Sequence, residues 1–302
     1  MIFFSGKYRF AATAFLAAAL LVVGVPSSTR GSGATAAAAP AAAPKPAVSS
    51  IGDAYDGELY GYRVSFWYFK KAAEASVGIS SVGNGRYKAV LSAHTTGVLS
   101  WVPGLRHRED TFTALLEETD GGRRFRTLEY EEVTKLGSKL TKKTFVFDYA
   151  KRSVQVDQWK NGEHRRSFVL TFKEGESFDD PLCAFYNFRY GVYGPIKAGS
   201  EYRIKTIPRK KDGEDIELLL SLISSKDYDA RYLKANGEGY YAYVKLDKEF
   251  LDSSSGNIEI LFDPAMAPKA TVAKDIMLFG DVKGALTGAT RPKKAVSGKP
   301  SE

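Results

Sequence analysis

The feature that most constrains the fold of this chain is a repeated alternation of apolar and polar residues, broken at short intervals by glycine, asparagine or aspartate. Strict alternation places the apolar side chains on one face of an extended strand. Asn-Gly pairs at 84–85 and 161–162 each lie between two such segments, and this dipeptide favours the tight turn of a β-hairpin. The segments with strand character are 58–68, 75–82, 86–94, 144–149, 154–156, 168–172, 202–207, 215–221, 228–233, 240–246, 257–262, 270–277 and 281–286.

This pattern predicts an all-β, mainly antiparallel fold. Glycine, Asn and Asp punctuate most of the joins, as short antiparallel connections require. About fourteen short strands in one domain favour a large curved sheet or a barrel-like arrangement. We expect the β domain to occupy residues 53–290, a length that one all-β domain can accommodate.

One segment departs from the alternation and predicts one short helix near 180–191. Asp180 is a natural helix N-cap, and Pro181 follows at the first helical position, where its missing N–H costs nothing. Gly191 is placed to end the helix. We expect this helix to cap one end of a barrel or to lie against the sheet. The residues at helical spacing on one side are Leu182, Phe185, Tyr186 and Arg189.

The first 36 residues have the order of a secretory signal peptide. Lys7 and Arg9 precede an apolar run over residues 10–25, and the small residues at 34–36 or 32–34 offer a cleavage site. The run is shorter than the roughly 20 residues that span a bilayer. We therefore expect export to the periplasm, and an inner-membrane anchor formed by residues 10–25 is the less favoured alternative. With Cys183 as its single cysteine, the chain has no internal disulfide.

The two ends carry most of the net charge of +8. An Ala/Pro-rich linker at 37–52 and a basic, disordered tail at 291–302 are expected from composition. Four cations precede residue 53 and the tail carries a net three, which leaves about one positive charge on the β domain. The charge therefore gives no reason to expect a nucleic-acid partner. Membrane contact is expected only transiently or through an uncleaved signal segment.

Four short stretches together carry a resemblance to a known family. The stretch DPLCAFYNFR at 180–189, with Gly199 and Tyr202 after it, is similar to the pattern D-x-L-S-A-x-Y-x-L-R…G-x-x-Y. GELYGY at 57–62 is similar to G-E-x-L-x-Y, and the stretch 96–112 to T-x-G…D-x-F. Phe262, Asp263 and Pro268 match W-x-S-D…P except for the Phe. These patterns are those of the DUF3108 family of exported bacterial proteins of unknown function, in which Ser is usual at the position of Cys183.

The resemblance implies a periplasmic or outer-membrane-associated, barrel-like fold, with kinship to small envelope lipoproteins near capsule export. It implies no activity and supplies no catalytic residue. The motif members Asp180, Pro181, Phe185, Tyr186 and Arg189 are therefore structural or ligand-facing candidates without an assigned role.

Metal and catalytic constellations are not predicted by this sequence. The three histidines, His94, His107 and His164, lack the spacing of a metal site. Cys183 lies in an apolar helix, which favours a buried core residue over a nucleophile. Of the Asp179–Asp180 pair, one carboxylate is needed as the helix cap, which favours structure over acid–base chemistry. We predict no cofactor and favour a non-enzymatic protein over an enzyme.

The aromatic content gives the remaining indication of function. Phe and Tyr number 18 and 17, and many fall at alternating strand positions, where ordinary core packing accounts for most of them. A barrel that is not wholly filled also leaves room for a lipid, and aromatic sheet faces can stack on a glycan. The candidate ligand contacts are Tyr60, Tyr62, Phe66, Trp67, Trp101 and Trp159.

Three functions stay open at this point. The first is a non-enzymatic envelope protein that binds a lipid or a glycan. The second is an assembly or scaffold protein of the envelope that binds protein partners through a sheet edge or the basic tail. The third is a polysaccharide hydrolase, which requires two carboxylates about 5–9.5 Å apart across a cleft.

Overall fold

The computed structural model describes residues 50–97, 107–176, 178–207, 216–224, 239–245, 253–276 and 279–290. The expected signal peptide, most of the linker, the basic tail, the strand predicted at 228–233 and the candidate Trp101 lie outside these residues. The helices are α2 (Ile51–Tyr55) and α3 (Pro181–Tyr190). The strands are β1 (Leu59–Phe66), β2 (Phe69–Gly83), β3 (Arg86–Thr95), β4 (Arg108–Thr119), β5 (Arg124–Leu136), β6 (Lys139–Asp148), β7 (Ser153–Lys160), β8 (Glu163–Thr171), β9 (Glu201–Thr206), β10 (Ile216–Ser224), β11 (Tyr240–Lys245), β12 (Asn257–Phe262), β13 (Pro268–Ile276) and β14 (Gly280–Thr290).

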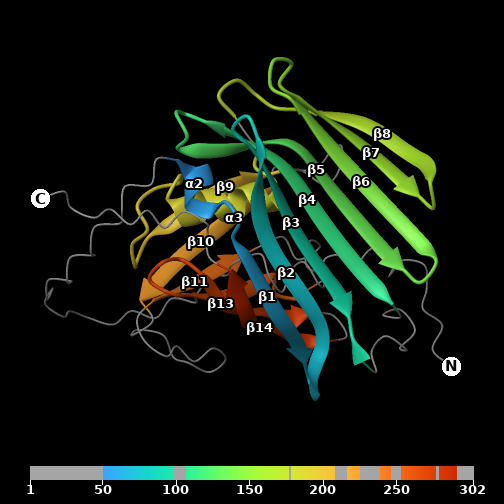
Figure 1. Ribbon diagram of the computed structural model, residues 1–302, viewed down its shortest axis with the longest axis vertical. Coiled ribbons are helices and arrows are strands. Elements are labelled where there is room, and N and C mark those ends of the chain that lie inside the picture. Colours follow the sequence, from blue (N-terminus) through green and yellow to red (C-terminus); the bar gives the residue numbers. More distant parts are fainter. Residues whose placement is uncertain are drawn as a thin grey trace, which may run out of the picture.

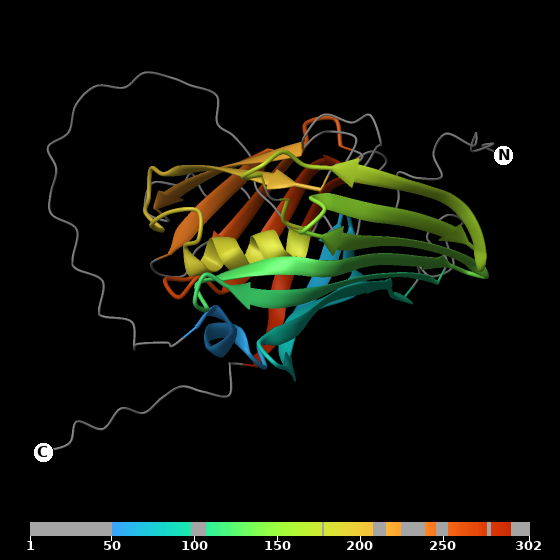
Figure 2. The ribbon, with the colours of Figure 1, turned by 90° about the horizontal axis from the view of Figure 1, so that it is seen from above.

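All fourteen strands belong to one antiparallel sheet, in the order β8-β7-β6-β5-β4-β3-β2-β1-β14-β13-β12-β11-β10-β9. Strand β1 pairs with β2 on one side and with β14 on the other, so both ends of the domain meet in the middle of the sheet. The sheet is large and strongly curved, and its edge strands are β8 and β9 (Figures 1 and 2). The predicted fold class is thereby confirmed.

Helix α3 lies inside the curve of the sheet. It contacts β3, β4 and β5 on one side and β9 on the other, and Figure 2 shows it between these two arms. Asp180 caps its N-terminus, Pro181 occupies the first turn, and Gly191 ends it with a φ of 90°. These boundary predictions are confirmed.

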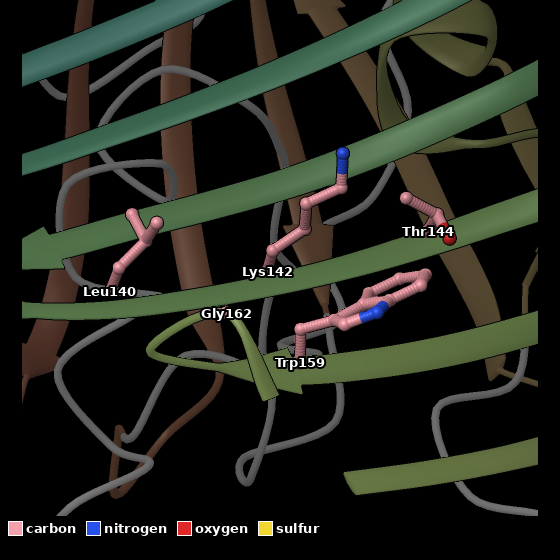
Figure 3. A pocket seen from close by; sticks show the side chains of 5 residues that line it. All are labelled: Leu140, Lys142, Thr144, Trp159 and Gly162. Atoms are coloured by element: carbon pink, nitrogen blue, oxygen red, sulfur yellow. The ribbon is translucent and has the colours of Figure 1, made fainter. Parts of the chain in front are cut away.

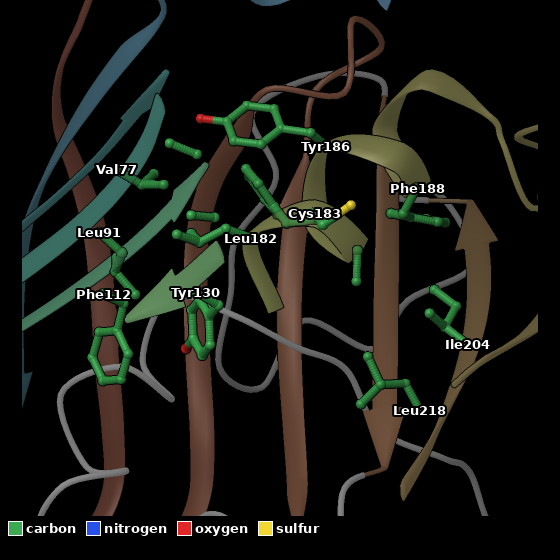
Figure 4. Packing of buried hydrophobic residues seen from close by; sticks show 14 of the residues in the cluster. Val77, Leu91, Phe112, Tyr130, Leu182, Cys183, Tyr186, Phe188, Ile204 and Leu218 are labelled. Carbon is green, nitrogen blue, oxygen red and sulfur yellow. The ribbon is translucent and has the colours of Figure 1, made fainter. Parts of the chain in front are cut away.

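The prediction that α3 has one apolar side is too narrow. Every residue from Leu182 to Arg189 is buried, so the helix exposes no polar face. A helix enclosed by sheet on both sides is buried all round, which explains why apolar residues also occupy its other positions. Figure 4 shows Val77, Leu91, Phe112 and Tyr130 on one side of the helix, and Ile204 and Leu218 on the other.

Helix α2 is a short element that the sequence pattern did not indicate. Its N-cap is Ser50, whose hydroxyl accepts a hydrogen bond from Asp53 N at 3.1 Å. Ile51 is fully buried, and Gly52 N donates to Glu118 Oε1 at 2.8 Å. The ordered contacts therefore begin two residues before the expected start at 53. In the described part of the chain, no helix is long and apolar enough to cross a membrane.

Candidate functional site

Arg189 on α3 forms a buried ion pair with Glu58, which directly precedes β1. Nη1 of Arg189 lies 2.5 Å from Oε1 of Glu58, and Nη2 lies 2.8 Å from Oε2. Nε donates to the carbonyl oxygen of Met266 at 2.7 Å. The side chains of Arg189 and Glu58 are 1% and 4% exposed. One guanidinium thus joins the helix, the start of the sheet and the turn before β13.

Aromatic rings surround this guanidinium. The Tyr60 hydroxyl donates to Glu58 Oε2 at 2.9 Å, which satisfies a further lone pair of the buried carboxylate. Burial disfavours the positive charge, but the carboxylate of Glu58 outweighs this, and the pKa of Arg189 lies well above its ordinary value. We call Arg189, Glu58 and the aromatic residues around the guanidinium the Arg189 cluster. The ring centroids within cation–π distance of the guanidinium carbon are those of Tyr55 at 4.7 Å, Phe185 at 4.9 Å, Tyr60 at 5.5 Å and Tyr186 at 5.7 Å.

Asp179 and Asp180 are both engaged by the protein at the start of α3. Asp180 Oδ1 accepts from the N–H groups of Leu182 and Cys183, and Oδ2 accepts from the Thr127 hydroxyl at 2.6 Å. Asp180 is fully buried, and burial raises its pKa to about 7. Asp179 pairs with Arg124 and accepts from the Tyr193 hydroxyl. Both carboxylates are buried and are bonded to groups of the protein.

Asp110, another residue of the resemblance, also serves the interior. It holds Arg108 through two contacts, at 2.6 Å to Nε and 2.9 Å to Nη2, and both side chains are buried. The Thr134 hydroxyl donates to its Oδ1 at 2.7 Å. Four residues that carry the resemblance, Glu58, Asp110, Asp180 and Arg189, therefore act as internal cross-links.

Cys183 and the histidines lie apart from one another. Cys183 is fully buried, its thiol donates to Phe125 O at 3.4 Å, and burial raises its pKa well above the ordinary value. Such a thiol stays protonated and is a poor nucleophile. His94 lies beside Glu74 on β2, and His164 beside Asp157 on β7. The described residues contain no group of His, Cys, Asp and Glu side chains that could hold a metal ion.

The candidate ligand-contacting aromatics divide into two groups. Tyr60, Tyr62 and Phe66 are at most 6% exposed, and the Tyr62 hydroxyl donates to the carbonyl of Pro268 at 3.0 Å. These three rings belong to the core. Trp67 is 65% exposed, and Trp159 is partly exposed on the face of the sheet turned away from the core. A ligand on the outside of the protein can reach Trp67 and Trp159 directly.

Trp159 lies in a hollow on the outward face of β6 and β7. The register places Trp159 opposite Lys142, while Phe145 and Val156 pair on the buried face. Figure 3 shows the Trp159 ring beside the side chains of β6. The hollow has a volume of about 280 Å³, and we call it the Trp159 hollow. Its lining residues are Leu140, Lys142, Thr144, Trp159 and Gly162.

Lys142 and His164 lie beside the Trp159 ring. Lys142 Nζ lies 5.8 Å from the ring centroid and forms an ion pair with Glu131 on β5. The His164 ring packs against Trp159 at 5.4 Å with an interplanar angle of 69°. The indole is thus fixed in place while it remains partly open to solvent.

A row of polar side chains continues from this ring across β7 and β8. His164 Nε2 lies 3.0 Å from Asp157 Oδ1, and this hydrogen bond lowers the pKa of Asp157. Gln155 Nε2 donates to Ser167 Oγ at 2.5 Å and contacts Asp157 Oδ2 at 3.3 Å. The face therefore offers one aromatic platform bordered by donors and acceptors. This arrangement suits reversible binding of a molecule that has both an apolar face and hydroxyl groups.

Trp159 is among the candidates from the sequence, whereas the other lining residues of the hollow are not. Leu140, Lys142 and Thr144 occupy alternate positions on β6, opposite in phase to the buried Phe145 and Phe147. The alternation gives their face, but it does not show which residue of another strand lies beside them. The lining was visible only once the β6–β7 register was known.

No family model matches the chain, and no curated protein matches it in sequence. Among solved structures, it is similar to a β-barrel-like protein of domain of unknown function DUF1849 from Brucella abortus, at 8% identity over 78% of this chain and 98% of that chain, with a TM-score of 0.46. A DUF1089 family protein from Pseudomonas aeruginosa matches at 10% identity over 68% of this chain and 91% of its own, with a TM-score of 0.28. A hypothetical protein from Chlamydia trachomatis matches at 13% identity over 82% and 95%, with a TM-score of 0.28. Membership in the DUF3108 family stays a prediction.

Proposed function

We propose that this chain is an exported, non-enzymatic protein of the cell envelope that binds a glycan in the Trp159 hollow. The observation that carries this proposal is a partly exposed indole, held between Lys142 and His164, beside the polar row of Gln155 and Asp157. A sugar ring has an apolar C–H face that packs on an indole and hydroxyls that bond to such a row.

A glycan fits this site better than a lipid. An acyl chain is best accommodated in an enclosed apolar cavity, whereas the Trp159 hollow lies on the outward face of the sheet. Inside the curve of the sheet, α3 is buried against apolar residues of the surrounding strands. Lys142 adds a cation at the rim, where it forms an ion pair with Glu131.

Two features support the expected location and family. Residues 1–36 have the order of a signal peptide, which directs the chain to the periplasm. The motif residues Glu58, Arg189 and Pro268 are far apart in sequence, yet they gather around one ion pair and one turn. This convergence supports the proposal that the chain is a DUF3108-like protein, because unrelated matches have no reason to meet in space.

Titration with oligosaccharides tests the glycan proposal. The probes are cellohexaose, chitohexaose and a hexuronic acid oligomer, each followed by heat of binding up to millimolar concentration. We expect at least one probe to bind, and Trp159→Ala to weaken it by at least about tenfold, because stacking on the indole is lost. The matched control is Trp67→Ala, which removes a more exposed indole elsewhere and should leave affinity unchanged.

Two results would overturn it. One is the absence of heat with all three probes, and the other is equal affinity of Trp159→Ala and the unaltered protein. Thermal unfolding of each variant shows whether the fold is retained, and the exposed position of both side chains predicts that it is.

A protein partner on the same face is the second candidate, and three exposed aliphatic side chains favour it. Leu140, Val146 and Val169 are 39%, 44% and 50% exposed, and their strands adjoin the Trp159 hollow. If this face binds an envelope protein, Val146→Ser with Val169→Ser should abolish in vivo crosslinking to a reproducible partner. The same pair of substitutions should leave oligosaccharide binding intact if the glycan proposal holds.

A further inference from the structure

The connection between β1 and β2 presents a group of aromatic side chains to solvent. Trp67 is 65% exposed, Tyr68 is 98% exposed and Phe69 is 37% exposed. These three residues are consecutive, and their turn projects at the lower end of the sheet in Figure 1. Exposed aromatic side chains in a contiguous group mark interaction sites.

The backbone of this connection is unusual for the residues it carries. Phe66 pairs with Phe69, which leaves Trp67 and Tyr68 as the whole connection. Trp67 has a φ of 46°, in the left-handed region that Gly, Asn and Asp favour in such turns. A large side chain is thus kept where a glycine would fit with less strain. Backbone strain that is retained at an exposed residue indicates a functional role for that residue.

The exposed rings stand on a firm aromatic base. The buried ring of Phe66 lies 5.6 Å from Phe69 and 5.1 Å from Phe279. Trp67 lies 5.9 Å from Phe66 and 6.4 Å from Phe279. Because Phe66 belongs to the core and Phe279 packs against it, Trp67 and Tyr68 project from a supported position.

Cationic side chains accompany the aromatic ones. Lys70 and Lys71 directly follow the turn and are exposed, and Arg63 is exposed on β1. The nearest carboxylate in this stretch is Glu74, which lies 2.7 Å from Lys71. Trp and Tyr concentrate at the interface between a bilayer and water, and Lys and Arg are attracted to anionic headgroups.

We propose that the β1–β2 turn is a membrane-surface anchor that inserts Trp67 and Tyr68 among the headgroups of an anionic bilayer. The amphipathic rings match the headgroup layer, and the lysines match its charge. Among the described residues, the side chains of the turn itself, Trp67, Tyr68 and Phe69, are aromatic and form no polar row of the kind that borders Trp159, so a sugar is the poorer match. This surface is distinct from the Trp159 hollow, and the two proposals can fail separately.

Vesicle binding with fluorescence tests this anchor on the full chain. The vesicles contain phosphatidylcholine with phosphatidylglycerol, with and without a brominated phospholipid that quenches nearby indoles. We expect the unaltered protein to show a blue-shifted, quenched component that Trp67→Phe lacks. Trp159→Phe is the matched control and should retain that component. This readout reports on Trp67 itself, so it is unaffected by any anchoring through residues 10–25.

Two pairs of substitutions separate the contribution of the aromatic rings to membrane binding from that of the lysines. Trp67→Gly with Tyr68→Ser removes both rings and relieves the turn, so the fold is retained, and partitioning through this site should fall at least about tenfold. Lys70→Gln with Lys71→Gln should weaken binding to the anionic vesicles but leave binding to pure phosphatidylcholine unchanged. Equal quenching of the unaltered protein and Trp67→Phe would overturn the proposal. Turn-dependent capture of a protein without any vesicle effect would overturn it as well, in favour of a protein partner.

Discussion

The Arg189 cluster and the Trp159 hollow use the same chemistry in opposite surroundings. Each places a cation near aromatic rings, with the Arg189 guanidinium 4.7 Å from Tyr55 and the Lys142 ammonium 5.8 Å from Trp159. The Arg189 side chain is 1% exposed, whereas that of Lys142 is 41% exposed. Burial makes the first a cross-link of the fold, because its partners are all internal. Exposure leaves the second free to exchange water for a ligand.

The residues that stand out in the sequence are therefore not the residues of the proposed binding site. Glu58 and Arg189 stand out in the sequence through their motifs, yet they hold the sheet to α3. Trp159 belongs to none of those motifs, and it lies in the hollow that we propose as the binding site. In this protein, the motif residues Glu58 and Arg189 stabilise the fold, whereas the proposed binding site lies on the exposed face of the sheet.

The largest expected effect comes from breaking the Arg189 cluster. Arg189→Met leaves the Glu58 carboxylate buried without its cation, which should lower the free energy of unfolding by about 3–5 kcal/mol. Urea unfolding followed by circular dichroism measures this change. Adding Glu58→Gln should recover part of the loss, because the uncompensated charge is then removed.

Tyr186→Phe is the matched control for that variant on the same helix. The Tyr186 hydroxyl is buried and has no hydrogen-bond partner in the described structure, so its removal should change stability by less than about 1 kcal/mol or increase it. If Arg189→Met also costs less than about 1 kcal/mol, the cluster is not the cross-link that its geometry indicates.

A pH-dependent effect is expected at the start of α3. Burial raises the pKa of Asp180 to about 7 in the folded protein, against about 3.9 for an unfolded Asp. Because the pKa is raised in the folded protein, the protonated Asp180 carboxyl contributes stability below pH about 4, and this contribution is lost as the pH rises through about 7.

The comparison with Asp180→Asn isolates the contribution of Asp180 ionisation to stability, since Asn keeps the helix cap. The unfolding free energy of the unaltered protein, relative to that of Asp180→Asn, should fall over this range by at most about 1.4 kcal/mol per pH unit. Urea unfolding at a series of pH values gives the slope. A difference that does not vary with pH would contradict the raised pKa.

A small stability effect is expected at the Trp159 hollow. Trp159→Ala should lower the free energy of unfolding by less than about 1 kcal/mol, because the indole is partly exposed and its cation–π contact is at the surface. Phe145→Ala, on the buried face of the adjacent strand, should cost about 3–5 kcal/mol. Thermal or urea unfolding of the two variants distinguishes the faces. A large loss in Trp159→Ala would make the indole a structural residue and weaken the contrast.

The sequence predicted the fold class well, and its omissions have physical causes. Strands β4 and β5 were not among the expected strands, although Phe112, Ala114 and Leu116 alternate on β4. On β5 the charged side chains are dense, and the pairing with β4 skips Leu128, which breaks the alternation of buried residues between Thr127 and Tyr130. A strand whose alternation of apolar and polar residues is interrupted is difficult to recognise from the sequence pattern.

Helix α2 was missed for a different reason. Five residues are too few to show a helical period, and its order depends on contacts with distant residues. Ile51 N donates to Gly122 O at 2.7 Å, and Gly52 N to Glu118. Such long-range bonds leave no local signal in the sequence.

The candidate site was predicted only in part. The aromatic candidates were chosen for residue type and strand position, which cannot distinguish the inner from the outer face. The structure places Tyr60 and Tyr62 in the core and Trp67 and Trp159 at the surface. That division depends on which face of each strand meets α3.

The sequence by itself determined the elements whose causes are local. Alternation determined most of the strands, the Asn-Gly pairs determined the β2–β3 and β7–β8 hairpins, and Asp180 with Pro181 and Gly191 determined the limits of α3. Tertiary structure alone decided that β1 pairs with β14, that Glu58 meets Arg189, and that Trp159 lies opposite Lys142 on the neighbouring strand. Local preferences act over a few neighbouring residues, whereas these pairings depend on the register and curvature of the whole sheet.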